Sequence, residues 1–303
     1  MFSNVPFDVS SNSLLYVNAA SYAPSNVKNI VVGNTAKAVS LSDAGGQFYC
    51  PKEFVAQNIT YTHNYSMTTG GNGQGWESIV LPFDVQRISH SSKGEIVPFA
   101  AYNVNDRSQR PFWLYRFGAS GFVRSSSISA NTPYIIAMPN NTIYDDEYIL
   151  AGDVTFSATN VSVKPSSQLS VSTSGGKTFT PAYQKIERSS SVYALNVNNR
   201  NASSSGGYDW GSRFIGNLRD VYPFEAYMLA SSAEAREFIE IEFEDVATGL
   251  DGIPMRNDSE RKVAVYSISG QLIMLEKRGL LDEKLQSLPS GIYIVDGNKT
   301  VVQ

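Results

Sequence analysis

The sequence predicts an all-β protein: an antiparallel β-sandwich of jelly-roll-like form with a small β tail at its C-terminus. Three observations predict this class. Apolar and polar residues alternate with period two in many short segments. Clusters of Gly, Pro, Asn and Ser separate these segments, as turns between strands require. Aromatic residues, which favour strands, make up 12% of the 303 residues.

The alternation places strands along the whole chain. The clearest is 237–244, where Ile239, Ile241 and Phe243 share one face and three glutamates share the other. The other predicted strands are 13–17, 30–32, 58–62, 78–83, 133–138, 154–156 and 226–229. Helical periodicity is short, and single helical turns are predicted only at 51–55, 232–237 and 282–288.

The largest shift in composition predicts the domain boundary. A β body is expected over 1–250, with a possible division into two packed sub-domains near 140–150. Gly, Pro and polar residues over 251–262 predict a linker. The tail, 263–303, should form four short strands at 263–268, 271–275, 292–295 and 299–302. Four short strands bury little surface, so the tail is expected to lean on the body.

Composition and charge exclude several classes of function. The net charge is −4 and Lys and Arg never form a long run, so the basic footprint of a nucleic-acid-binding protein is missing. No apolar stretch has the length of a membrane span, so the chain is not expected to cross a membrane. Only 17% of residues are charged, and this polar, weakly charged composition favours an extracellular location. No leader peptide is recognised at residue 1, so export would require that a leader has been removed or that the parent chain is longer.

The sequence predicts no catalytic residue, metal site or cofactor, and an enzyme is the least favoured class. Cys50 is the single cysteine and is expected to be a small buried hydrophobe. The two histidines, His63 and His90, lack the partners that a zinc site needs. A glycosidase needs two opposed carboxylates, and among many candidates, which include Glu53, Glu77, Asp84 and Glu225, none stands out.

Aromatic residues beside polar loops offer the more interesting chemistry. Two loops are rich in Gly, Asn and Ser, at 68–75 and 196–211. Trp76 and Trp210 adjoin them and are the candidate ligand-binding residues, because exposed rings stack on sugars. Trp113, inside an apolar segment, is expected to lie in the core.

Six residues of the tail belong to a recognisable motif. Residues 265–271 read Val-Tyr-Ser-Ile-Ser-Gly-Gln, and residues 288–299 read Leu-Pro-Ser-Gly-Ile-Tyr-Ile-Val-Asp-Gly-Asn-Lys. They resemble the C-terminal sorting domains of type IX secretion cargo in Bacteroidetes, which implies export and cell-surface anchoring. The body, above all 75–83, resembles a β-rich module that follows leucine-rich repeats in Bacteroidetes surface proteins. The motif positions are Tyr266, Gly270, Leu288, Gly291, Tyr293 and Gly297.

These observations favour a non-catalytic extracellular surface protein, an adhesion or interaction module with a sorting or anchoring tail. Its expected partner is a host or cell-envelope protein or a glycan. The alternative is a carbohydrate-binding module that uses Trp76 and Trp210.

Overall fold

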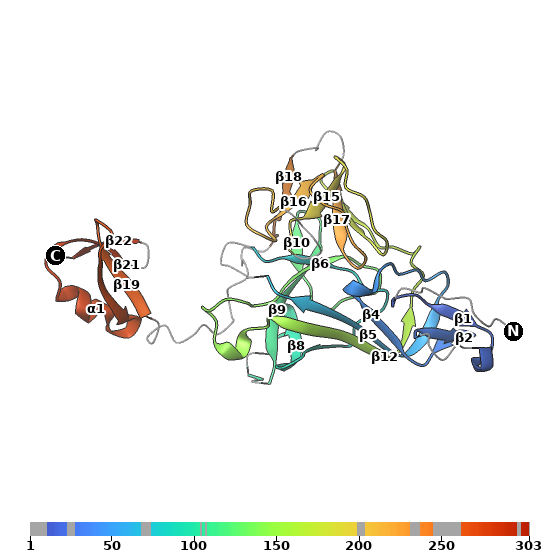
Figure 1. Ribbon diagram of the computed structural model, residues 1–303. Helices are drawn as coiled ribbons and strands as arrows, with labels where there is room; N and C mark the ends of the chain where they lie inside the picture. The colour runs from blue at the N-terminus through green and yellow to red at the C-terminus, as the bar shows by residue number, and fades with distance from the viewer. Residues whose placement is uncertain are drawn as a thin grey trace. The chain divides into compact units, whose positions relative to one another are not determined.

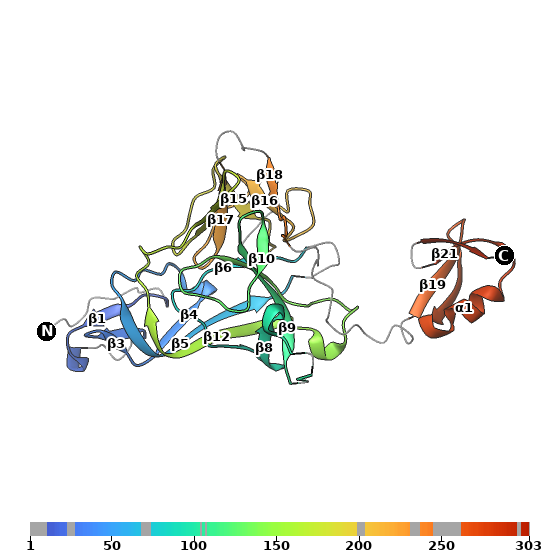
Figure 2. The same ribbon diagram turned by 180° about the vertical axis from the view of Figure 1, so that it is seen from behind.

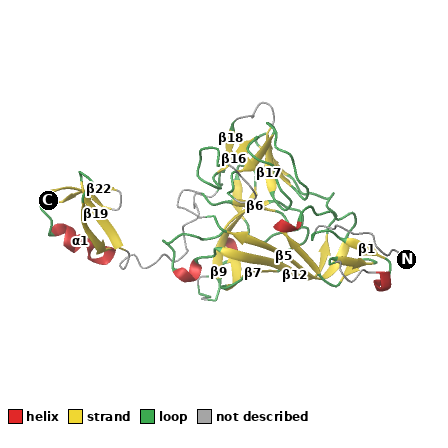
Figure 3. Cartoon of the chain, viewed as in Figure 1, coloured by secondary structure: helices red, strands yellow, loops and turns green. Residues whose placement is uncertain are grey.

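The computed structural model confirms that the protein is mostly β (Figures 1 and 3). It describes residues 11–22, 28–67, 74–103, 105–106, 108–198, 204–230, 237–244, 262–295 and 298–302. Within these residues α1 (Arg278–Gln286) is the only α-helix, beside four short 3-10 turns. The chain divides into two compact units: residues 1–141 with 147–252, and residues 253–303 with 142–146.

The larger unit, which we call the body, is built on a 12-stranded sheet. Ten of its strands follow one another in the order β1-β2-β3-β5-β12-β7-β8-β9-β11-β6. Of the other two, β10 pairs with β9 and β4 pairs with β5. Its strands are β1 (Leu15–Val17), β2 (Ile30–Val32), β3 (Thr35–Ala36), β4 (Val39–Ser42), β5 (Phe54–Tyr65), β6 (Glu77–Ile79), β7 (Arg87–His90), β8 (Gly94–Pro98), β9 (Arg110–Phe117), β10 (Phe122–Arg124), β11 (Tyr134–Ala137) and β12 (Gly152–Val163).

The two long strands β5 and β12 form the centre of this sheet, and Figure 2 shows them running side by side. Alternate residues of β5 point into the core, among them Tyr61, His63 and Tyr65. On β12, Val154 and Phe156 also point into the core and are fully buried. The period-two pattern of the sequence is therefore the cause of these elements.

The prediction of an antiparallel β-sandwich is confirmed only in its β character. Four strand pairs of the 12-stranded sheet are parallel: β1 with β2, β3 with β5, β4 with β5, and β8 with β9. These pairs give the body an arrangement closer to a β-solenoid than to a clear sandwich. Alternation of side chains reports that a segment is a strand, but the direction of its neighbour depends on contacts distant in sequence.

A second, six-stranded sheet completes the body, in the order β13-β14-β17-β15-β16-β18. Ser78 on β6 joins it to the first sheet, because its hydroxyl bridges the backbone of Ala226 on β17. The backbone N–H of Val80 also donates to the carbonyl of Phe224 at 2.9 Å. The strands are β13 (Ser172–Ser174), β14 (Lys177–Pro181), β15 (Val192–Leu195), β16 (Arg213–Gly216), β17 (Ala226–Ala230) and β18 (Phe238–Glu240).

The C-terminal unit is a four-stranded sheet in the order β20-β19-β21-β22, packed against α1. Its strands fall where the sequence places them: β19 (Lys262–Ser267), β20 (Leu272–Lys277), β21 (Gly291–Val295) and β22 (Asn298–Val302). Helix α1 begins before the helical turn predicted at 282–288. Its Leu281 and Leu285 pack on Val263 and Val265, so this unit has an apolar core of its own.

Two further expectations have clear outcomes. The helical turn predicted at 51–55 is wrong, because β5 begins at Phe54, whose side chain is buried in the core of the body. The strand predicted at 237–244 is confirmed for Phe238–Glu240, and Phe243 makes an isolated bridge to Phe122. Residues 232–236 and all of the predicted linker but Lys262 lie outside the described residues. The predicted boundary at 250 and the division near 140–150 stay predictions.

Candidate functional site

The most unusual chemical grouping in the body is a buried histidine between two carboxylates. On β5, His63 directs Nε2 to Oε2 of Glu77 at 2.8 Å, and Nδ1 to Oδ2 of Asp43 at 2.9 Å. The side chains of His63 and Glu77 are 7% and 6% exposed. Strand alternation turns His63 inward, and β6 presents Glu77 from the far end of the same sheet. We call Asp43, His63 and Glu77 the histidine cluster.

The two carboxylates hold His63 in its charged form. Burial alone lowers the pKa of His63. The Coulombic attraction of Glu77, together with hydrogen bonds to Asp43 and Glu77, outweighs burial and raises the pKa to about 9. Both ring nitrogens donate in the imidazolium form, so each faces an acceptor. At neutral pH the cluster is a buried imidazolium bound on both sides.

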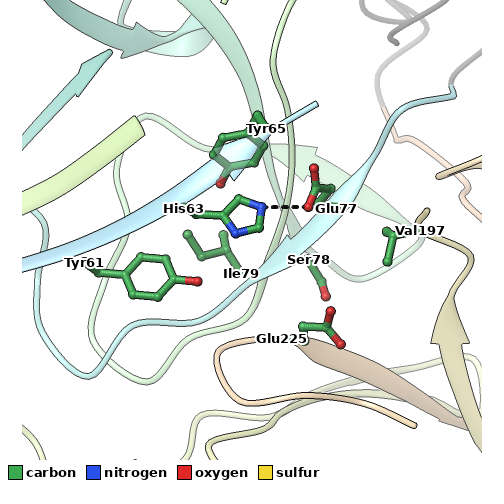
Figure 4. A pocket seen from close by; sticks show the side chains of 8 residues that line it. All are labelled: Tyr61, His63, Tyr65, Glu77, Ser78, Ile79, Val197 and Glu225. Atoms are coloured by element: carbon green, nitrogen blue, oxygen red, sulfur yellow. Dashed lines mark hydrogen bonds and ion pairs between the residues drawn. The ribbon is translucent and has the colours of Figure 1, made fainter. Parts of the chain in front are cut away.

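A small cavity adjoins the histidine cluster (Figure 4). It lies at the junction of the two body sheets, since residues of β5 and β6 line one side and Val197 and Glu225 the other. Its volume of about 10 Å³ is room for one water molecule and not for a sugar ring. The eight lining residues are Tyr61, His63, Tyr65, Glu77, Ser78, Ile79, Val197 and Glu225.

The polar side chains around the cavity have structural partners. The Ser78 hydroxyl donates to the carbonyl of Ala226 and accepts from its N–H, so it joins two strands. The Glu225 carboxylate accepts from Nη1 of Arg219 at 2.8 Å and from the N–H of Tyr222 at 2.9 Å. Glu77 and Glu225 thus face one cavity, as the carboxylates of a glycosidase would, but each is held by a buried cation.

The two polar loops singled out in the sequence meet beside this junction. The N–H of Gly75 donates to the carbonyl of Trp210 at 2.9 Å, and the N–H of Trp76 donates to the carbonyl of Gly211 at 3.1 Å. Gly211 adopts φ +67°, and a Cβ there would collide with the backbone of Trp76. Only glycine therefore allows the two segments to approach so closely. We call Gly75, Trp76, Trp210 and Gly211 the loop junction.

Asn196 fixes the second loop from inside. Its side-chain amide donates to the carbonyls of Ser205 and Asp209 at 3.0 and 2.9 Å. Its side-chain oxygen accepts from the N–H groups of Ser212 and Arg213 at 2.9 and 3.0 Å. The side chain is fully buried, so these four hydrogen bonds satisfy it completely. The backbone on both sides of Trp210 is consequently rigid.

The structure separates the two tryptophans proposed as ligand-binding residues. The prediction that Trp76 binds a ligand is wrong. Trp76 is 3% exposed and its ring packs on Tyr115 and Phe243, so it has no free face for a sugar. Trp76 follows a polar loop, but it directly precedes the buried strand β6 and its side chain lies in the core. Trp210 is half-buried at the loop junction and keeps an accessible part. Trp113, expected in the core, is 3% exposed, as predicted.

The chain matches no family model, no curated protein and no solved structure. No cluster of three His, Cys, Asp or Glu side chains suited to a metal occurs within the described ranges. Among those same ranges, no helix has both the length and the apolar character needed to cross a bilayer.

Five of the six tail-motif residues can be placed in the C-terminal unit. Gly270 has φ +85° in the turn between β19 and β20, where its N–H donates to the carbonyl of Ser267. Leu288 and Tyr293 pack against the core, while Tyr266 is exposed on β19. Gly291 begins β21, and Gly297 lies outside the described residues. The motif therefore marks turns and strands of one small fold and does not gather at a single point.

Sequence reasoning missed the histidine cluster and the Arg219–Glu225 pair. Asp43, His63 and Glu77 are far apart in sequence, and only the strand pairing of the sheet brings them together. One signal was available: in 58–65 the alternation that buries Ile59 and Tyr61 also buries His63. A buried histidine requires a polar partner, so the pattern pointed to a partner without identifying it.

Proposed function

We propose that this protein is a non-catalytic extracellular surface protein whose body is an adhesion or interaction module. The observation that carries the proposal is the loop junction, where two polar loops from different sheets are fixed to each other at Gly75–Trp76 and Trp210–Gly211. Loops held by a rigid scaffold are the usual place for recognition. The polar, weakly charged composition suits a surface outside the cell.

The chemistry of the buried charges supports a binding role over a catalytic one. In the described body, His63 is bound by Asp43 and Glu77, and Arg219 is bound by Glu225. Of these paired charges, His63, Glu77 and Glu225 line the cavity at the junction of the two sheets, and the cavity has room for one water molecule. The hydrogen bonds between the sheets, from Ser78 to Ala226 and from Val80 to Phe224, favour a body that behaves as one packed, sandwich-like scaffold beneath its loops.

We assign the C-terminal unit the role of a sorting or anchoring tail in the Bacteroidetes cell envelope. Support comes from its motif residues and from its separate core, which lets it fold as a module. The test is to express the full-length gene product, with and without residues 263–303, and to measure which is exposed to protease added outside the cell. Surface exposure that depends on the tail is expected. Cytosolic retention of the complete protein would overturn the proposal.

A second candidate function is carbohydrate binding through Trp210 alone. It is favoured by the partial exposure of Trp210, whose backbone is held by hydrogen bonds from Asn196 and Gly75. A glycan array probed with the wild type and with Trp210→Ala tests it. Tyr22→Ala is the matched control, because Tyr22 is an exposed aromatic residue near the β1 edge of the body. Binding lost only in Trp210→Ala supports the function, and absence of any bound glycan rejects it.

A further inference from the structure

The sheet of the C-terminal unit has one covered face and one open face. Helix α1 covers the inner face, where Leu281 and Leu285 pack on Val263, Val265 and Val295. The register places the alternate residues of each strand on the outer face, since neighbouring residues of a strand point to opposite sides. In the described residues nothing packs on that outer face as α1 does on the inner one.

The centre of the outer face is apolar, and apolar residues from all four strands contribute to it. Tyr266 on β19 lies opposite Ile294 on β21 and opposite Leu272 on β20. A β-bulge between Val265 and Tyr266 inserts one extra residue, Ile273, on β20. Towards the sheet ends, Leu275 pairs with Ala264, and Ile292 pairs with Val301. The exposed fractions are Tyr266 38%, Leu272 53%, Ile273 40%, Leu275 55%, Ile292 46% and Val301 66%. We call these six residues the outer patch.

The outer patch differs from the surface of the body. Of the 13 large hydrophobic side chains that are exposed in the described residues, eight belong to the C-terminal unit. The other five are scattered singly over the body, which is normal for a soluble protein. The exposed surface of the outer patch sums to roughly 600 Å², the upper end of the largest apolar patch on a typical monomer. A patch of this size on one flat sheet marks a docking surface.

The charge on this face selects the kind of partner. The charged residues of this face lie at its margin: Lys277 pairs with Lys262 at one end of β19 and β20, and Lys299 lies on the edge strand β22. The centre of the patch therefore offers no complement to a charged surface or an acidic peptide. A second apolar sheet fits best, because two sheets pack face to face about 10 Å apart with interdigitating side chains. From the margin, Lys277 and Lys299 can keep their ammonium groups in water.

We propose that the outer patch binds the same patch of a second copy of this chain, so that two C-terminal sheets form one sandwich. A two-fold arrangement needs a single self-complementary surface, and a patch whose centre carries no charge provides it. Burying both copies of the patch removes roughly 1,200 Å² from water, which reaches the lower limit for a specific interface. The dimer is therefore expected to dissociate in the micromolar range. It does not depend on what the body binds.

The test is sedimentation velocity of the purified full chain over a range of concentrations. A monomer–dimer equilibrium is expected for the wild type. Leu275→Lys and Val301→Lys each place a charge inside the interface and should weaken dimerisation at least 100-fold. Leu280→Lys is the matched control, because Leu280 is an exposed hydrophobic residue on α1, outside the four-stranded sheet, and this variant should dimerise as the wild type does.

Thermal unfolding checks that all three variants fold, and exposed positions should tolerate lysine. A wild type that stays monomeric up to about 100 µM overturns the proposal, whether the patch then faces the body or another partner. Dimerisation that survives both patch variants overturns it as well. So does a dimer that Leu280→Lys disrupts equally, since the contact would then involve the helix.

Discussion

Nε2 of His63 and Oε2 of Glu77 lie 2.8 Å apart inside the body, and this contact connects strands from the centre and the end of one sheet. The pair is buried, with side chains 7% and 6% exposed. Removing one member of a buried ion pair leaves the other charge without compensation, which costs far more than loss of an exposed pair. Asp43 on the opposite side of the ring makes His63 the central member of the cluster.

Replacing His63 should strongly destabilise the body. His63→Leu leaves the buried carboxylate of Glu77 and the partly exposed carboxylate of Asp43 without their cation, and we expect the free energy of unfolding to fall by about 3–5 kcal/mol. Urea unfolding followed by tryptophan fluorescence measures it. Arg87→Ala is the control, because the Arg87–Glu95 pair lies on the surface with side chains 63% and 56% exposed. The free energy of unfolding of Arg87→Ala should fall by less than about 1 kcal/mol. Equal losses would show that the histidine cluster is not a buried ion pair.

Stability should fall as the pH rises from neutral to alkaline. The pKa of His63 is about 9 in the folded protein, against an ordinary value of 6.5. A raised pKa means that the folded state binds the proton more tightly, so this stabilisation is complete below pH 6.5 and disappears as the pH passes 9. The total effect is at most about 3 kcal/mol. Unfolding free energies measured from pH 6 to pH 10 should show this decline, and His63→Gln should flatten it.

Gly211 should tolerate alanine less well than Gly207 does. Both have positive φ, +67° and +84°, so alanine strains the backbone at either position, by about 1 kcal/mol. At Gly211 the added Cβ also meets the backbone of Trp76, whereas at Gly207 it meets open space. Gly211→Ala should therefore lower the unfolding free energy by clearly more than Gly207→Ala. Similar values for the two variants would mean that the loop junction is not closely packed.

Asn196 should control the order of the loop that carries Trp210. Asn196→Ala removes four hydrogen bonds at a fully buried position and leaves backbone groups without partners, each at about 1–3 kcal/mol. Hydrogen exchange at the amides of Ser212 and Arg213 should become much faster. Asn58→Ala is the control, because the amide of exposed Asn58 makes a single long bond to Lys37. Unchanged protection in Asn196→Ala would contradict this assignment.

The sequence predicted strands well and their partners poorly. Alternation identified β2 at Ile30–Val32 and all four strands of the C-terminal unit, because period two follows from the geometry of a single strand. The parallel pairing of β4 with β5 could not be read in this way. It depends on which surfaces meet after the chain has turned, and a short sequence window contains no such information.

The candidate site was predictable only in part. Polar loops rich in glycine were recognised, and their meeting at Gly75 and Trp210 gives them a structural role. Trp76 was misjudged, because the residue after a loop can as readily enter the core as face solvent. The histidine cluster was missed because its members, such as Asp43 and Glu77, belong to segments that only the folded sheet joins.

Cys50 was expected to be a buried hydrophobe, and its side chain is indeed 1% exposed. Burial raises the pKa of its thiol, and its Sγ lies 3.1 Å from the carbonyl oxygen of Lys52. A thiol in this state reacts slowly with maleimides and disulfide reagents. Because it is the only cysteine of the chain, a second one introduced at the surface would be the sole site for a fluorophore or spin label. Two such cysteines would allow the distance between two dyes to be measured on the otherwise native protein, with no need to delete a background thiol.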